Sequence, residues 1–134
     1  MSTEESRRVA LQWVECIAEG RDDDLSAITA PEGTWWISGL KETSAMAGTY
    51  TFTERKDHLK KLFAGKKSFE FPIKGVTAEG DTVIVEALIR VETEDARVYA
   101  NDMLLKFVVK DGKVQSLKEY ADLVPVLKFI GAHV

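Results

Sequence analysis

The sequence predicts an α+β domain in which a cone-shaped, curved antiparallel sheet wraps around a long N-terminal helix. Two observations predict this class. Helical periodicity dominates the first half of the chain, and strict apolar–polar alternation dominates the second half. The expected order of elements is α-α-β-α-β-β-β-β-α, and the length fits a single domain over residues 1–134. The mouth of such a cone is a natural site for a small molecule.

The first helix is expected over residues 4–19, where the apolar side chains follow one stripe and Gly20 stands at the end. The stretch RDDDLSAIT predicts a short second helix, because its aspartates suit a helix N-terminus. Pro31 to Gly33 then interrupt the chain, and a short strand is expected over residues 34–37.

The third helix is expected in TFTERKDHLKKLFAG, with Thr53 as its N-cap and Gly65 at its end. Asp111-Gly112 is a strong signal for a two-residue hairpin. A short apolar helix closes the chain. The remaining strands are predicted at residues 68–77, 82–93, 97–110 and 114–121.

The strand at residues 82–93 has two contrasting faces. Val83, Val85 and their alternate neighbours form a uniformly apolar face, whereas Glu86 and Arg90 interrupt the other face. If the second face lines the cone, Glu86 is a buried carboxylate and a candidate site residue. If it faces outward, the two charges form a solvated or interfacial pair. The apolar character of the opposite face favours an outward orientation of Glu86 and Arg90. A mostly apolar face with a few polar residues, however, also suits a pocket. The alternation is compatible with both orientations.

Composition and charge exclude several classes of function. The net charge is −4, and no basic run is present, so neither nucleic acid nor an anionic membrane is expected as a partner. No apolar run approaches the ~20 residues of a membrane span, and we expect a cytoplasmic protein. Cys16 is the single cysteine, which excludes an intrachain disulfide. Phosphate-loop, GxSxG and HExxH motifs are absent, and neither a cofactor nor a metal is predicted.

Four segments in order carry a family resemblance. They are the first helix with Gly20 and the acidic second helix, then a tryptophan-bearing strand with AGTYTFTERKDHLKKLF, then AEGDTVIVEALI, and finally YANDMLLKFVVKDGKVQSLKEYADLVPVLKFIG. In these segments the sequence resembles the SnoaL-like branch of the nuclear-transport-factor-2-like superfamily. That group includes polyketide cyclases, ketosteroid isomerases and limonene-epoxide hydrolases. The resemblance implies a SnoaL-like, cystatin-like α+β fold, whereas this fold hosts many chemistries.

The site residues of these families transfer only in part. The ketosteroid-isomerase tyrosine falls on Trp13, its first aspartate near Ile37 or Ser38, and its second near Met103, so that constellation is absent. The DYFDL-like segment of limonene-epoxide hydrolases resembles EYADL, and its water-activating aspartate matches Asp122. SnoaL-type cyclases also place an acid/base aspartate near this position. The resemblance therefore implies Asp122 as catalytic acid/base, and the alternative is that Asp122 only caps the last helix.

The expected ligand is a small, hydrophobic organic molecule held in an apolar pocket, with Asn101 or Tyr99 bonded to its oxygen. For Asn101 the alternative is a hydrogen bond to neighbouring backbone. The resemblance also implies a homodimer paired through the sheet. Whether the protein is an enzyme stays open, because a non-catalytic binding module or an assembly protein would have the same features. The residues predicted to line the pocket are Trp13, Trp36, Phe63, Glu86, Tyr99, Asn101 and Met103.

Overall fold

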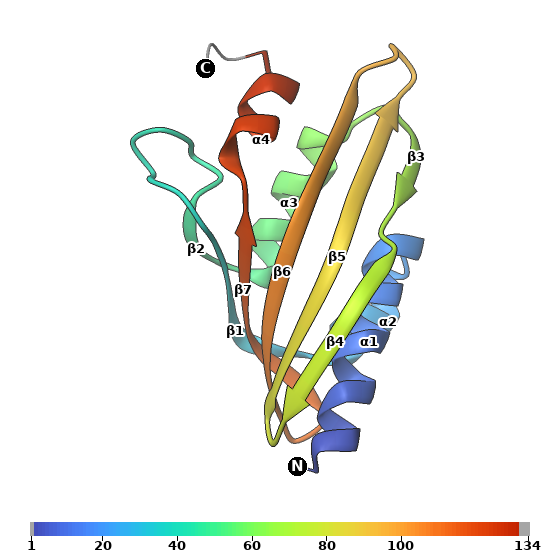
Figure 1. Cartoon of the computed structure of the whole chain (residues 1–134), viewed down its shortest axis with the longest axis vertical. Coiled ribbons are helices and arrows are strands. Elements are labelled where there is room, and N and C mark those ends of the chain that lie inside the picture. Colours follow the sequence, from blue (N-terminus) through green and yellow to red (C-terminus); the bar gives the residue numbers. More distant parts are fainter. Residues whose placement is uncertain (1, 132–134) are drawn as a thin grey trace.

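The computed structural model describes residues 2–131 and shows a curved, unclosed sheet of seven strands with helices packed against its concave face (Figure 1). The α+β class and the predicted succession of helices and strands are confirmed. The elements are α1 (Thr3–Glu19), α2 (Asp22–Ala27), β1 (Thr29–Ile37), β2 (Gly48–Thr51), α3 (Phe52–Leu62), β3 (Lys66–Glu70), β4 (Ile73–Glu79), β5 (Thr82–Thr93), β6 (Val98–Lys110), β7 (Lys113–Ala121) and α4 (Leu123–Phe129).

The sheet has the strand order β2-β1-β7-β6-β5-β3, and β4 also pairs with β5. All neighbouring pairs are antiparallel except β1 with β7, which is parallel. The sheet is therefore mixed, whereas the sequence predicted an antiparallel one. Because most of the chain separates β1 from β7, no tight hairpin forces these two strands to run in opposite directions.

Strand β1 is longer than predicted, because Pro31 and Gly33 do not interrupt it. The register with β7 shifts between Thr29 and Thr34, and this irregularity accommodates the proline. A Cβ added at Gly33 would lie 2.7 Å from the Phe52 ring and 2.9 Å from the Gln115 carbonyl oxygen, so only glycine fits this approach.

The predicted strand at residues 68–77 is divided into β3 and β4, which follow one another along the same edge of β5. Pro72 stands between them, and its carbonyl oxygen accepts a hydrogen bond from the Leu88 amide at 3.0 Å. A proline has no N–H to donate to the ladder, which explains the interruption. Strand β2, which is not among the strands predicted from the sequence, pairs with β1 as a short edge strand.

The termini of the elements follow local chemistry. Gly20 ends α1 in the left-handed conformation with φ of 68°, as predicted. The N-cap of α3 is Thr51 rather than Thr53, because Thr51 and Glu54 form a reciprocal capping box. Asp111 and Gly112 both have positive φ, which confirms the predicted two-residue hairpin between β6 and β7.

The hydrophobic core lies between α1 and the concave face of the sheet. Trp13 is its largest buried side chain, and its indole N–H donates to the Thr29 hydroxyl at 3.2 Å. The alternation predicted for β5 is confirmed, since Val83 and Val85 are fully buried while Glu86 is exposed. Within residues 2–131, no helix has the length and apolar character to span a membrane.

Candidate functional site

A narrow cavity of about 50 Å³ lies between the concave face of the sheet and helices α1, α3 and α4. Most of its lining is apolar, including Trp13, Trp35 and Phe63. Among the described residues that line it, only Tyr99 and Glu119 carry an ionisable side chain. The cavity is thus an apolar space with two polar groups, the usual composition of a small-molecule site.

Glu119 reaches this cavity because of its register in β7. It pairs with Ile37 of β1 on one side and with Leu105 of β6 on the other, and both partners are buried. Side chains alternate along a strand, so the neighbouring Lys118 and Tyr120 are exposed on the convex face. The indole N–H of Trp35 donates to Glu119 Oε1 at 3.2 Å.

The surroundings of Glu119 change its acidity. Burial among apolar side chains raises the pKa of Glu119 to about 7, while the hydrogen bond from Trp35 and the charge of Arg55 act in the opposite direction. A carboxyl group with this pKa exists in both protonation states near neutral pH. It can therefore accept or release a proton at low cost, as general acid–base catalysis requires.

Arg55 is a fully buried cation that stabilises the backbone behind the wall of the cavity. Its guanidinium donates to the carbonyl oxygens of Trp35 at 3.1 Å, Met46 at 2.6 Å and Gly48, and it stacks on the Tyr50 ring. The side chains of Trp35 and Met46 line the cavity, so Arg55 fixes part of that wall from α3. Burial lowers the pKa of Arg55, although the nearby charge of Glu119 opposes this effect.

Tyr99 and Asn101 form a buried polar pair on β6. The Asn101 amide donates to the Tyr99 hydroxyl at 2.9 Å and to the Asp122 carbonyl oxygen at 2.8 Å. Burial raises the pKa of Tyr99, so its hydroxyl stays protonated. In the part of the chain that the structure describes, this hydroxyl donates to no protein acceptor, and its proton is free for a ligand in the cavity.

Asp122 lies outside the cavity. It is the N-cap of α4, its carboxylate accepts a hydrogen bond from the Val124 amide at 2.9 Å, and its side chain is exposed. The capping arrangement that the sequence left as an alternative is thus present. The backbone carbonyl oxygen of Asp122 accepts a hydrogen bond from the Asn101 side chain. This is the hydrogen bond to backbone that the sequence left as the alternative role for Asn101.

The structure places two predicted pocket residues, Trp36 and Glu86, on the convex face of the sheet. Trp36 packs against Tyr120 with ring centroids 5.1 Å apart, and Glu86 is exposed opposite Leu104. The cause is alternation, because the adjacent Trp35 occupies the inward position of β1.

Four of the predicted pocket residues do meet in the cavity: Trp13, Phe63, Tyr99 and Met103. Asn101 lies one hydrogen bond behind Tyr99. Glu119 was missed, although a signal for it exists: Leu117, Glu119 and Ala121 alternate with Lys118 and Tyr120, which predicts an inward Glu119. Within residues 2–131, no three His, Cys, Asp or Glu side chains are placed together to hold a metal ion.

Comparisons with known proteins agree with this architecture. The family model described as a SnoaL-like domain matches residues 10–117. A Burkholderia xenovorans NTF2-like protein has a similar structure, with a TM-score of 0.73, 22% identity, and coverage of 96% of this chain and 97% of that one. An LEH-like epoxide hydrolase of M. tuberculosis superposes with a TM-score of 0.74, 18% identity, and coverage of 95% and 90%.

A third similar structure is TerC co-crystallised with polyporic acid, with a TM-score of 0.79, 15% identity, and coverage of 96% of this chain and 99% of that one. At these identities the likeness shows a common fold. No curated protein matches the sequence at a significant level.

Proposed function

Because the chain belongs to the SnoaL-like domain family, we propose that it is an acid/base enzyme that acts on a small, mostly apolar organic molecule. The single observation that carries this proposal is Glu119, whose carboxyl group is the one carboxyl among the described residues that line the apolar cavity and whose pKa is raised to about 7. Burying an ionisable group costs stability, so a carboxyl group in this position is typical of a functional site.

The chemistry that fits best is proton transfer at a carbon atom beside a carbonyl group. The Glu119 carboxylate takes the proton from that carbon, and the electron pair of the broken C–H bond moves onto the carbonyl oxygen as an enolate. The Tyr99 hydroxyl, held by Asn101, donates a hydrogen bond to this oxygen. In an isomerisation the enolate is conjugated with a C=C bond, and the protonated Glu119 returns its proton to the far carbon of that system. In a ring closure the enolate carbon attacks a second carbonyl carbon of the same molecule, the π electrons of that carbonyl move onto its oxygen, and Glu119 protonates the resulting alkoxide.

The cavity favours this chemistry over opening of an epoxide by water. Hydrolysis of an epoxide needs a base for the water and an acid for the epoxide oxygen. Among the described lining residues, Glu119 is the single carboxyl group, and Tyr99 with its raised pKa is a weak acid. One carboxyl group is sufficient for proton shuttling, because the same group takes and returns the proton.

The test is a turnover screen of ketones, lactones and epoxides with three proteins: the wild type, Glu119→Gln and Asp122→Asn. We expect Glu119→Gln to lower kcat by about 100-fold or more while KM changes little, because Gln keeps the hydrogen bond from Trp35 but carries no proton to exchange. Asp122→Asn is the matched control, and its turnover should stay close to wild type. Loss of turnover in Asp122→Asn alone would restore the acid/base role predicted for Asp122 and refute the role of Glu119.

A second candidate function is binding without chemistry. The hydrogen bond between Trp35 and Glu119 supports it, since a carboxyl group that accepts a buried indole N–H has a structural partner already. A pure binder would take up ligands from the screen without converting them. In that case neither wild type nor Glu119→Gln would convert a ligand, and the two proteins would bind it with the same affinity.

The convex face of the sheet supports the expected homodimer. Leu104 is 46% exposed and pairs across the ladder with Tyr120, which is 45% exposed, and Trp36 packs beside them. Such a contiguous exposed apolar group is typical of an interface. We expect light scattering to give the mass of a dimer and Leu104→Asp to give a monomer. Leu40→Asp, in an exposed loop, is the control, and a monomeric wild type at high concentration would refute this expectation.

A further inference from the structure

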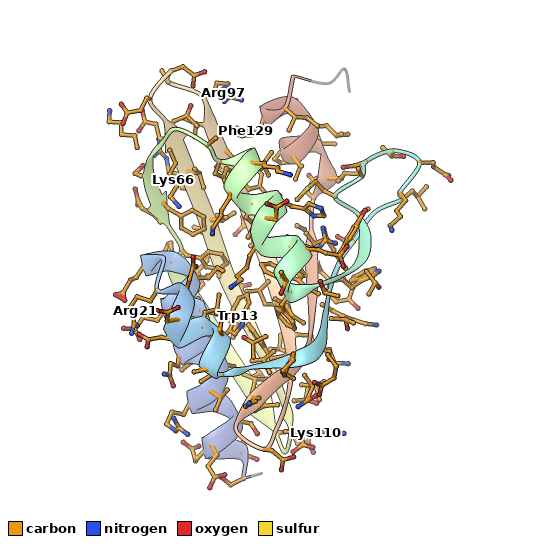
Figure 2. All side chains as sticks on the ribbon, turned by 180° about the vertical axis from the view of Figure 1, so that it is seen from behind. Trp13, Arg21, Lys66, Arg97, Lys110 and Phe129 are labelled. Carbon is orange, nitrogen blue, oxygen red and sulfur yellow. The ribbon has the colours of Figure 1, made fainter. Side chains whose placement is uncertain are left out.

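An open groove of about 390 Å³ lies outside the cavity, between the C-terminal end of α1, helix α3 and strand β3. Ile17, Leu59, Phe63 and Phe69 line both the groove and the cavity. The two spaces therefore adjoin at these four side chains. Figure 2 shows Lys66 on this side of the molecule, beside α3 and beyond the end of α1.

The rim of the groove is basic. Lys56, Lys60 and Lys66 line it together with one acidic side chain, Asp22. Lys60 is paired with Asp22 at 3.5 Å, whereas Lys56 contacts the neutral hydroxyl of Ser26 at 3.4 Å. The ammonium of Lys66 lies 5.4 Å from the centre of the Phe69 ring. Among the described residues that line the groove, Lys56 and Lys66 are thus not paired with a carboxylate, on a chain whose net charge is −4.

We propose that the ligand of this site is a small organic anion, with its apolar body in the cavity and its carboxylate or phenolate in the groove beside Lys56 and Lys66. This inference rests on the proposed function, because it assigns a ligand class to the same cavity. The apolar wall shared by the two spaces takes the body of the molecule. The ammonium groups of Lys56 and Lys66 attract its charged end.

The positions of the lysines in the groove and of Glu119 in the cavity also set the orientation of the bound ligand. Glu119 lies inside the cavity, and its ionised form repels a second negative charge. The anionic end therefore stays outward, and the carbon atoms that meet Glu119 and Tyr99 belong to the end of the molecule away from the charge.

The test compares two probes that differ in charge and share a chain length, octanoate and 1-octanol. Binding is followed near pH 8, where octanoate is ionised, by the fluorescence of Trp13 and Trp35, which line the cavity. The groove variant is Lys56→Gln with Lys66→Gln. The control variant is Lys110→Gln with Lys113→Gln, at the hairpin between β6 and β7, where Figure 2 places Lys110 at the far end of the molecule.

We expect wild type and control to bind octanoate roughly tenfold more tightly than 1-octanol, and the groove variant to lose this preference while its affinity for 1-octanol is unchanged. High salt should weaken the preference in the wild type. Equal affinities in the wild type, or a preference that survives in the groove variant, would overturn the inference and leave the proposed function standing. If neither probe binds, the cavity is not a ligand site, and the proposed function fails together with the inference.

Discussion

Glu119 and Asp122 are two carboxyl groups three positions apart in the chain, and the structure puts them in opposite environments. Glu119 lies near the end of β7 on the concave face, where burial raises its pKa to about 7. Asp122 caps α4 at the surface, where its carboxylate accepts a hydrogen bond from the Val124 amide. The helix or strand that carries a carboxyl group therefore decides what that group can do, more than its place in a sequence motif does.

The physical cause is the change of backbone geometry between the two residues. In a strand every second side chain faces the same way, so Glu119 follows Leu117 toward the core. At the start of a helix the first amides have no backbone acceptor, and the side chain of the N-cap turns back to accept from them. Asp122 therefore points to its own helix rather than to the cavity.

The largest expected effect is on the pH dependence of stability, which should depend on Glu119. A carboxyl group whose pKa is raised from 4.5 to about 7 binds its proton more tightly in the folded state. The stabilisation that the protonated Glu119 adds to the folded state is fully present below about pH 4.5, and it is lost as the pH rises through about 7. Between these two pH values the free energy of unfolding of wild type should fall by up to about 3 kcal/mol relative to that of Glu119→Gln.

Urea unfolding at a series of pH values measures this loss. Asp122→Asn serves as the control, and its pH dependence should follow that of wild type over the same range. Parallel curves for wild type and Glu119→Gln would show that Glu119 is not desolvated.

A smaller effect, on kcat, is expected from Tyr99→Phe. This variant tests the polar residue that lines the cavity together with Glu119. The change removes one hydroxyl and leaves the bond from Asn101 to the Asp122 carbonyl oxygen in place. We expect kcat to fall by about 100-fold with little change in KM, as for loss of one oxyanion donor. Tyr120→Phe, on the convex face, is the matched control in the same kinetic assay. An unchanged kcat in Tyr99→Phe would remove this residue from the mechanism.

The smallest expected effect belongs to Asp122. Asp122→Ala deletes the N-cap of α4 and should lower the free energy of unfolding by about 1 kcal/mol without affecting turnover. Asp122→Asn should keep most of that stability, because Asn is an equally good cap. Thermal unfolding and the turnover assay together check both statements, and a kinetic defect in a stable Asp122→Asn protein would contradict them.

The sequence predicted well those features that depend on local pattern. The alternation at residues 82–93 predicts β5 correctly, because a half-buried strand needs period-two side chains. Gly20 and Asp111-Gly112 mark a helix end and a hairpin, since both need positive φ. The resemblance in EYADL drew attention to Asp122, whereas the same alternation applied to Leu117 and its neighbours would have identified Glu119.

Other parts of the candidate site depend on contacts that periodicity does not encode. Arg55 looks like an ordinary surface residue of an amphipathic helix, yet its guanidinium is buried and satisfied by three carbonyl oxygens from β1, β2 and the loop between them. The long β1 depends on the close fit of Gly33 against Phe52, which only the packed structure reveals. Such cases need the tertiary arrangement, because local propensity points elsewhere.

The pKa of Glu119, measured by carbon-13 NMR on carboxyl-labelled protein with Glu119→Gln for assignment, tests the acid/base role of this residue most directly. We expect a pKa of about 7, because the carboxyl group is desolvated in an apolar cavity. A pKa at or below the ordinary value of 4.5 would mean that the group is solvated or stabilised as a carboxylate. That result would contradict its role as the acid/base of this site.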